Sequence, residues 1–377
     1  MKKLIFALLL FASSAFAQSV PDEFLVRFKA GANLESVYAN FGAVKIKTLT
    51  PLRIDLVRVP AAASAALQAA LRKNPQVDFI EPNFIGSADI IPNDPSYSSQ
   101  WHLPKINAPA AWNGSTGSQR NYIAIIDSGI DQLHADLSMR VGSGYNFLSN
   151  NYNTQDTGAL GGHGTAVSGA AAAMTNNSVG VAGVDWQTII MPLVVLNASN
   201  VATVADVAEA VNYAADHGAK IINISLGFTT YSSTLQTAVN YAYGLGSMIV
   251  ASAGNSNSDA LHYPASMSNV IAVGATDQSD VKASFSNYGS WLDVVAPGVT
   301  ILTTKLAGGY WNTQGTSLAA PLVSGLLSIM WGKNNTISQA NMETWLKNCA
   351  VDLGAAGFDN TYGYGRINAQ CSVEAVP

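Results

Sequence analysis

Charged side chains are scarce in this chain, because Asp, Glu, Lys and Arg make up only 11% of its 377 residues, against about 25% in typical globular domains. With hydrophobic residues at 48%, this composition excludes an intrinsically disordered protein, which has high charge and few apolar residues. The formal net charge is -5, and Lys and Arg form no clusters. Nucleic acid is therefore not an expected partner, since binding phosphates needs clustered Lys and Arg.

Cysteine is also scarce, with Cys349 and Cys371 as the only two in the chain. Two cysteines are too few for a disulfide-built scaffold, and neither belongs to a CxxC pair of the kind found in zinc ribbons or thioredoxin-like motifs. In an oxidising compartment Cys349 and Cys371 would pair and close a C-terminal loop. Two buried free thiols are the alternative, because sequence does not show whether their Cα atoms are close enough for a bond.

No apolar run reaches the length of about 20 residues that a membrane-spanning helix needs. The run at residues 4–12 follows two lysines and precedes Ala-Phe-Ala at residues 15–17, which is the layout of a secretory signal peptide. A membrane anchor is the alternative, and the shortness of the run disfavours it. We expect cleavage before Gln18, and therefore a secreted protein, extracellular or periplasmic, without a membrane anchor.

After residue 17 the chain changes character at about residue 88. Residues 18–88 carry 8 basic and 6 acidic side chains, whereas the remainder carries 9 and 18, so opposite net charges favour attraction between the two pieces. The first piece has the pattern of a small α+β domain, with strands at 23–28, 54–59 and 77–80 and helices at 34–41 and 61–72. Residues 81–95 contain three prolines and are expected to form an exposed linker.

The second piece alternates short apolar runs with helical patterns, which predicts an α/β fold: a doubly wound, mostly parallel sheet with helices on both faces. The expected strands are 122–126, 189–196, 220–224, 248–251 and 270–273, and the expected helices are 164–174, 204–216, 235–243, 317–331 and 338–347. In such folds, sites lie beyond the carboxyl ends of the strands.

Three polar residues stand at places where such a fold carries chemistry. Asp127 ends an apolar strand, His163 opens a helix after two glycines, and Ser317 opens another helix. A serine hydroxyl becomes a nucleophile when an imidazole takes its proton and a buried carboxylate holds that imidazole. Singly, each residue is more often a cap or a turn former, so only the combination predicts nucleophilic catalysis.

The blocks around these residues resemble the subtilisin-like serine peptidases over about residues 92–365. The matching blocks are Ile125-Ile126-Asp127-Ser128-Gly129, His163-Gly164-Thr165, Gly315-Thr316-Ser317 with Ala320-Pro321, and Ala253-Gly254-Asn255. The resemblance implies that Ser317 is the nucleophile, His163 the general base and then acid, and Asp127 the orienting carboxylate. Asn255 would stabilise the oxyanion together with the backbone N–H of Ser317.

The same resemblance implies a substrate groove with polypeptide substrates. Two segments would wall the S1 pocket and bind the peptide by strand addition, namely Ser225, Leu226 and Gly227, and Ser252, Ala253 and Gly254. His262 would form the pocket floor, which favours mid-sized apolar or aromatic P1 residues. Asn200-Val201-Ala202 departs from the Gly-rich edge strand usual in the family, and this departure would narrow the outer subsites.

One structural Ca²⁺ site is implied by resemblance to a calcium loop in the family. The ligands would be the side chains of Asp94, Asp136 and Asn177 and the carbonyl groups of Met174, Val179 and Val181. A plain turn at Asn177 is the alternative. A second family loop, at residues 146–155, has amides and a serine where carboxylates are expected, so we predict no second calcium there.

The resemblance makes the first piece, residues 18–90, an inhibitory propeptide ahead of a catalytic domain at 91–377. The expected molecule is a self-processing serine endopeptidase that acts as a monomer. A catalytically silent binding module is one alternative. An α/β-hydrolase esterase is another, although it would carry G-x-S-x-G around the nucleophile, and Ser317 lies in GTSLA. Carboxyl-peptidase relatives use a glutamate where His163 stands and are disfavoured.

Overall fold

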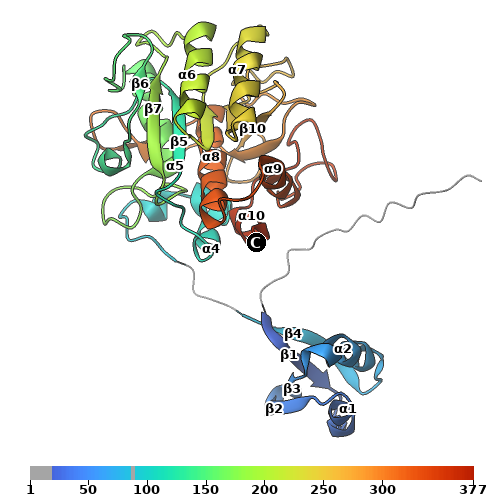
Figure 1. Ribbon diagram of the computed structural model, residues 1–377. Helices are drawn as coiled ribbons and strands as arrows, with labels where there is room; N and C mark the ends of the chain where they lie inside the picture. The colour runs from blue at the N-terminus through green and yellow to red at the C-terminus, as the bar shows by residue number, and fades with distance from the viewer. Residues whose placement is uncertain (1–18, 86–89) are drawn as a thin grey trace, which may run out of the picture. The chain divides into compact units, whose positions relative to one another are not determined.

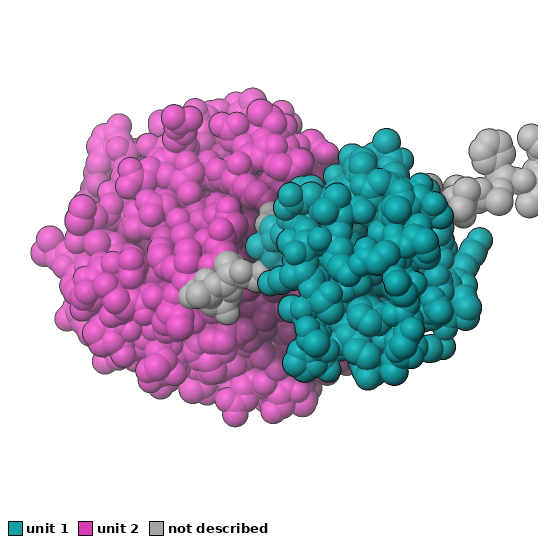
Figure 2. All heavy atoms as spheres, turned by 90° about the horizontal axis from the view of Figure 1, so that it is seen from below, with its two compact units in different colours: residues 1–88 teal, residues 89–377 magenta. Residues whose placement is uncertain are grey.

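The computed structural model describes residues 19–85 and 90–377, so the predicted signal peptide lies outside the described residues. The chain divides into two compact units, residues 1–88 and 89–377, which are coloured separately in Figure 2. Each unit has its own hydrophobic core. The two are described separately below.

The first unit is a four-stranded antiparallel sheet in the order β2-β3-β1-β4, with two helices packed on it. Its elements are β1 (Ser19–Phe28), α1 (Glu35–Asn40), β2 (Val44–Leu49), β3 (Ile54–Arg58), α2 (Ser64–Lys73) and β4 (Val77–Phe84). Phe24 and Val26 of β1 pack against Leu67 and Leu71 of α2 in its core. This is the predicted α+β unit, with one strand more than expected.

Two details of the first unit differ from the sequence prediction. Strand β2 was not expected, because most of its side chains are exposed and no buried face marks it in the sequence. The predicted linker at 81–95 begins too early, since β4 continues through Pro82 to Phe84. Proline is tolerated there because β4 is an edge strand that pairs with β1 alone.

The second unit is built on a parallel sheet in the order β11-β10-β9-β8-β5-β7-β6. Its strands are β5 (Tyr122–Asp127), β6 (Tyr145–Asn146), β7 (Ile189–Val194), β8 (Ile221–Ile224), β9 (Met248–Ser252), β10 (Val270–Thr276) and β11 (Val294–Pro297), and β12 (Ile301–Thr304) pairs with β13 (Tyr310–Thr313) in a separate hairpin. The helices are α3 (His102–Lys105), α4 (Ala108–Trp112), α5 (His163–Ala172), α6 (Val204–Asp216), α7 (Ser233–Gly244), α8 (Thr316–Lys333), α9 (Gln339–Asn348) and α10 (Ala369–Ala375).

The predicted doubly wound parallel sheet is confirmed (Figure 1). Along β5, Ile123 and Ile125 pack in the core with α5 and α8, whereas Ala124 and Ile126 pack in the core with α6 and α7. Successive side chains of a strand point to opposite faces, so both faces of the sheet are covered by helices. The unpredicted elements β6, β11, β12, β13, α3, α4 and α10 are too short to show a hydrophobic period.

Helix α8 runs through the core of the second unit, and its residues 316–331 are all buried. Its apolar character therefore reflects burial in protein. Among residues 19–85 and 90–377, no helix has the length and apolar character to cross a membrane.

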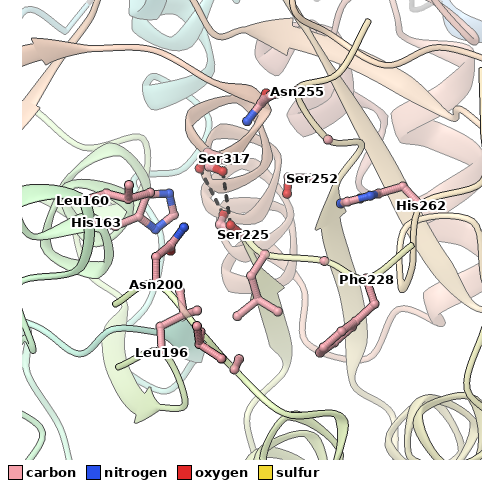
Figure 3. A pocket seen from close by; sticks show the side chains of 15 residues that line it. Leu160, His163, Leu196, Asn200, Ser225, Phe228, Ser252, Asn255, His262 and Ser317 are labelled. Atoms are coloured by element: carbon pink, nitrogen blue, oxygen red, sulfur yellow. Dashed lines mark hydrogen bonds between the residues drawn. The ribbon is translucent and has the colours of Figure 1, made fainter. Parts of the chain in front are cut away.

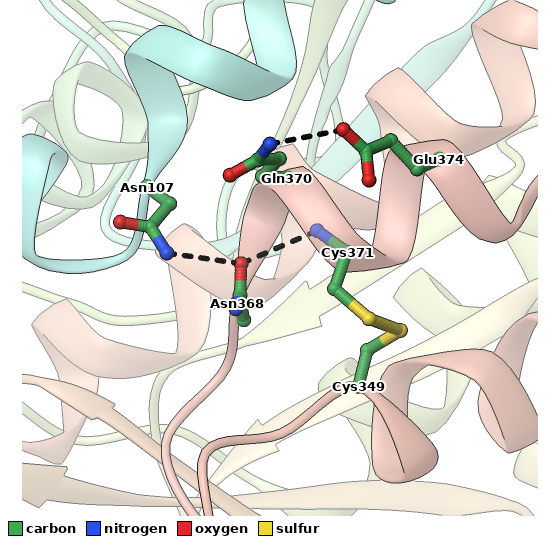
Figure 4. The surroundings of a disulfide bond; sticks show 6 residues. All are labelled: Asn107, Cys349, Asn368, Gln370, Cys371 and Glu374. Atoms are coloured by element: carbon green, nitrogen blue, oxygen red, sulfur yellow. Dashed lines mark hydrogen bonds between the residues drawn. A yellow bond between two sulfur atoms is a disulfide. The ribbon is translucent and has the colours of Figure 1, made fainter. Parts of the chain in front are cut away.

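The C-terminal segment is closed by a disulfide bond. Cys349, directly after α9, is bonded to Cys371 in α10, with Cα atoms 5.4 Å apart (Figure 4). Asn368 caps α10 by accepting the backbone N–H of Cys371 and also accepts a hydrogen bond from the Asn107 side chain. Of the two alternatives that the sequence left open, the structure therefore contains the disulfide bond, and neither cysteine is a free thiol.

Candidate active site

Asp127 and His163 meet at the carboxyl end of β5. Asp127 is the last residue of β5 and is fully buried, and His163 is the first residue of α5. The imidazole Nδ1 lies 2.8 and 2.9 Å from the two carboxylate oxygens of Asp127. The backbone N–H of Ser128 donates to the same carboxylate at 2.7 Å. These contacts fix the ring with Nδ1 toward the acid and leave Nε2 for chemistry.

The electrostatic surroundings of His163 favour its protonated form. Burial by itself lowers the pKa of the imidazole, but the charge and hydrogen bond of Asp127, together with the charge of Asp156, outweigh it, so the pKa lies above its usual value. An imidazole that is stabilised as a cation is suited to accept a proton from a neighbouring hydroxyl.

Ser317 lines the same cavity as His163 and lies in the first turn of α8 (Figure 3). Its Oγ donates to the carbonyl oxygen of Ser225 at 3.1 Å, and its own carbonyl accepts from the Ser225 hydroxyl at 3.0 Å. No hydrogen bond joins Ser317 to His163, although the structure describes both residues. Such contacts commonly tighten only when substrate is bound.

Asn255 is held so that its amide nitrogen is available to the cavity. Its Oδ1 accepts the backbone N–H of Thr316 at 2.9 Å and the Thr316 hydroxyl at 3.0 Å. With the oxygen engaged, the NH₂ group is the free end, and Figure 3 shows it turned toward Ser317. The N-cap of helix α8 is Gly315, which has no side chain to accept the other N–H groups of the first turn. The side-chain amide and the helix N-terminus together can stabilise a negative oxygen.

The cavity has a volume of about 370 Å³, and six of the seven expected S1 residues line it together with His163, Asn255 and Ser317. Ser225, Leu226 and Gly227 follow β8, and Ser252 and Gly254 lie at the end of the adjacent strand β9. Ala253, the remaining expected wall residue, is fully buried and does not line the cavity.

His262 lies between two glycines of these walls. A Cβ atom at Gly227 would overlap its ring, and one at Gly254 would come within 3.2 Å of it. Burial lowers the pKa of His262, so the ring is neutral at neutral pH. The expected pocket floor is therefore an uncharged imidazole that requires glycine at position 227.

Several residues of the cavity were not predicted from the sequence. Leu160, Leu196 and Phe228 add apolar surface to it. Leu160 is 60% exposed and has a left-handed backbone with φ 49°. In the sequence, its place between Gly158 and Gly161, three residues before His163, was the feature that could have identified Leu160 as a cavity residue. Asn200, Val201 and Ala202, the departure noted in the sequence, also line the cavity.

The expected calcium ligands lie together in the second unit. The Asp94 carboxylate accepts the backbone N–H groups of Asn176 (2.7 Å) and Asn177 (3.3 Å). The Asp136 carboxylate accepts the Asn177 amide and the backbone N–H of Val181, both at 2.9 Å. The backbone N–H of Met174 donates to the backbone carbonyl oxygen of Asp136 at 2.7 Å.

The charge balance of this cluster fits a cation. Asp94 and Asp136 are both buried, and no Lys or Arg forms an ion pair with either in the described chain. Burial, with a smaller contribution from the charge of Asp136, raises the pKa of Asp94 despite its backbone hydrogen bonds. Oxygen ligands of this kind suit Ca²⁺. Among residues 19–85 and 90–377, no three His, Cys, Asp or Glu side chains gather as a metal site, so a cation held here would need further ligands from Asn177 and backbone carbonyls.

Comparisons with known proteins show which family the chain belongs to. Residues 118–365 match the Subtilase family, Peptidase S8, and residues 10–83 match the fervidolysin N-terminal prodomain. The chain is 40% identical over 361 residues to a thermophilic serine proteinase of Bacillus sp. (strain AK1), covering 94% of this chain and 88% of that protein. It is 43% identical over 284 residues to thermitase of Thermoactinomyces vulgaris, covering 75% and 99%.

Solved structures give the same result. A protease from Pseudoalteromonas arctica superposes with a TM-score of 0.71 at 30% identity, covering 76% of this chain and 99% of that one. Fervidolysin from Fervidobacterium pennivorans, a keratinolytic enzyme related to subtilisin, has a TM-score of 0.69 at 25% identity and covers 95% and 62%. The chain therefore belongs to the subtilase family of serine endopeptidases, and its N-terminal unit is a prodomain.

Proposed function

We propose that this endopeptidase cuts peptide bonds with Ser317 as nucleophile, His163 as general base and acid, and Asp127 as orienting carboxylate. The observation that carries the proposal is that His163, hydrogen-bonded to the buried Asp127, lines the same cavity as Ser317. A fluorophosphonate probe tests it. We expect one covalent label per chain, mapped to Ser317 by peptide mass spectrometry. An unlabelled, folded protein would instead indicate a silent binding module.

Acylation follows from the hydrogen bonds of the site. Ser317 Oγ rotates away from the Ser225 carbonyl, gives its proton to His163 Nε2 and bonds to the scissile carbonyl carbon. The developing negative charge on the carbonyl oxygen is accepted by the Asn255 amide and the backbone N–H of Ser317. The imidazolium, stabilised by Asp127, then gives the proton to the leaving amine, and water releases the acyl group by the same steps.

Asn255→Ala is expected to lower kcat by about 10²–10³ with little change in KM, a magnitude taken from the asparagine of subtilisin itself. The reason is that the amide faces the oxyanion and not the ground-state substrate. Steady-state kinetics with a chromogenic peptide measure this effect. Asn257→Ala, which removes a nearby amide bonded to Lys282, is the matched control. Equal losses in kcat for the two variants would contradict the assignment.

We propose a P1 preference for mid-sized apolar or aromatic residues. The floor is the neutral ring of His262, and none of the described residues that line the cavity is acidic. A P1-randomised peptide library is expected to give the highest kcat/KM for such residues. His262→Asp is expected to improve cleavage after Lys or Arg, and His217→Asp on the surface is the control. A strict Lys or Arg preference of the wild type would refute the proposal.

We further propose that residues 18–90 act as an inhibitory propeptide of a secreted zymogen, with a signal peptide at 1–17 and a catalytic domain at 91–377. The prodomain family match supports this, and Glu81-Pro82-Asn83-Phe84 resembles the ending of many such propeptides. The C-terminal tail of the propeptide would occupy the substrate groove, and the cut would fall between residues 86 and 93. The opposite net charges of the two pieces favour their association.

One structural Ca²⁺ is proposed as well. Asp94, Asp136 and Asn177 would hold it with side-chain oxygens, and Met174, Val179 and Val181 with carbonyl oxygens. Bound there, the ion would neutralise two buried carboxylates and tie the segment at Asp94 to the loop at residues 174–181.

A further inference from the structure

A second buried carboxylate, Asp156, lies beside the Asp127–His163 pair. It belongs to the loop before α5 and is 8% exposed. Its Oδ1 accepts the Ser128 hydroxyl and the backbone N–H of Gly158, both at 2.9 Å. Its Oδ2 accepts the backbone N–H of Thr165 at 3.0 Å and the Thr165 hydroxyl at 2.6 Å. Both oxygens therefore have two donors each.

The hydroxyl groups of Ser128 and Thr165 both donate their hydrogen to Asp156. The Ser128 oxygen already accepts the backbone N–H of Gly164 at 2.9 Å, and the Thr165 oxygen accepts that of Asp131 at 3.0 Å. Each hydroxyl therefore gives its own hydrogen to Asp156. A carboxyl group surrounded by donors alone is an ionised acceptor. Asp156 thus contributes a fixed negative charge.

The partners of Asp156 come from both sides of the catalytic pair. Ser128 directly follows Asp127, and Thr165 is two residues after His163. Helix α5 has Gly162 at its N-cap and no capping side chain of its own, so Asp156 supplies the anionic acceptor that a helix N-terminus favours. One carboxylate therefore joins the end of β5 to the first turn of α5.

We propose that Asp156 is a positioning residue for the catalytic pair, which fixes the approach of Asp127 to His163 and stabilises the imidazolium formed when Ser317 loses its proton. The inference rests on the proposed triad. It adds to that triad a second anion, which acts through Ser128 and Thr165 without touching the substrate. Asp156 adds a second negative charge near the imidazole, while Asp127 remains the carboxylate that is hydrogen-bonded to the ring.

The charged groups that act on the His163 ring are Asp127 at the end of β5 and Asp156 in the loop before α5. Strands β7 and β12, which pack on α5, contain no charged residue, and neither does the first turn of α8. Removing the charge of Asp156 therefore makes the imidazolium less stable and lowers the pKa of His163. Since the neutral ring is the base, the acid limb of activity moves to lower pH.

Asp156→Asn is the test, with kcat/KM for a small chromogenic peptide measured against pH. We expect the acid limb to move down by roughly half a pH unit or more and kcat at neutral pH to fall about tenfold. Ser128→Ala, which removes the hydrogen bond to Asp156 and the one from the Gly164 N–H but keeps the charge of Asp156, should lower kcat severalfold without moving the limb. Asp131→Asn is the matched control, because Asp131 is a buried carboxylate that accepts only backbone N–H groups, from Leu133 and Ala307. It should leave the limb in place.

An acid limb of Asp156→Asn that superimposes on the wild type would overturn the proposal, as would an equal shift in Asp131→Asn. Thermal melting verifies that each variant is folded. If Asp156→Asn does not fold, Ser128→Ala decides the matter, and wild-type kcat in that variant would overturn the positioning role. Failure of the triad itself is distinguishable, because the wild type would then be inactive or Ser317→Ala would remain active.

Discussion

Ser317→Ala is expected to accumulate as a signal-free but otherwise full-length chain, because the same hydroxyl that cuts substrates would cut the propeptide. Its peptidase activity should fall by about six orders of magnitude, the loss found when the triad serine of subtilisin is removed. Alanine preserves the buried first turn of α8, so a stable fold is expected. Mass spectrometry of the intact protein and of its N-terminus measures signal removal and propeptide cleavage together.

The control for this experiment is Ser372→Ala in α10. Ser372 is fully buried, and its hydroxyl has no hydrogen-bond partner in the described chain. The substitution therefore removes a buried hydroxyl without touching the cavity, and processing should be normal. Normal propeptide cleavage in Ser317→Ala would show that another protease performs the cut.

If Ser317→Ala stays uncleaved, it can be mixed with a trace of active enzyme. Cleavage of the variant in this mixture would show that one chain cuts another, and no cleavage would indicate that each chain cuts itself.

Removal of calcium is expected to produce the largest loss of stability. If the free ion is present at about 1,000 times its Kd, binding contributes about 4 kcal/mol to the free energy of unfolding. For a domain of this size that corresponds to a fall in Tm of roughly 10 °C when EDTA is added. The physical reason is that Asp94 and Asp136 are then left as two buried like charges. The experiment uses the mature form with its serine blocked by a fluorophosphonate, which prevents self-digestion during heating.

Asp94→Ala is expected to remove most of the difference between calcium and EDTA and to lower Tm in calcium. Asp277→Ala is a matched control, because Asp277 also accepts two backbone N–H groups, from Ser279 and Val281, but lies in an exposed turn outside the cluster. Its response to EDTA should equal that of the wild type. A wild-type melting curve that does not change with EDTA would eliminate the calcium site.

The sequence was informative where burial or chemistry imposes a pattern. Strands such as β5, with Ile123 and Ile125 on one face and Ala124 and Ile126 on the other, are buried on both sides, so they appear as continuous apolar runs. Asp127 was found because it ends such a run. Strand β2 was missed because its side chains are mostly exposed, and β6 was missed because two residues have no period.

The supporting groups of the candidate site were harder to predict. Asp156 lies in a loop, and its role depends on contacts with Ser128 and Thr165 that no sequence spacing reveals. Leu160 lines the cavity from a left-handed turn, a conformation that leucine rarely adopts. Conversely, Ala253 belongs to the predicted wall by its block, yet its side chain points into the core. A block match identifies a segment, whereas the direction of each side chain follows from the fold.

The contact of His262 with Gly227 and Gly254 has a consequence for changes of specificity. A side chain at position 227 would overlap the imidazole, so Gly227 can change only if His262 is first removed or displaced. Gly254 is restricted separately, because its φ is 99° and the Asn287 amide nitrogen lies 2.5 Å from the place of a Cβ atom. Random mutagenesis of the walls alone is expected to return only glycine at both positions. A new side chain in the wall at position 227 is therefore accessible by one order of steps, in which a smaller residue replaces His262 before Gly227 changes.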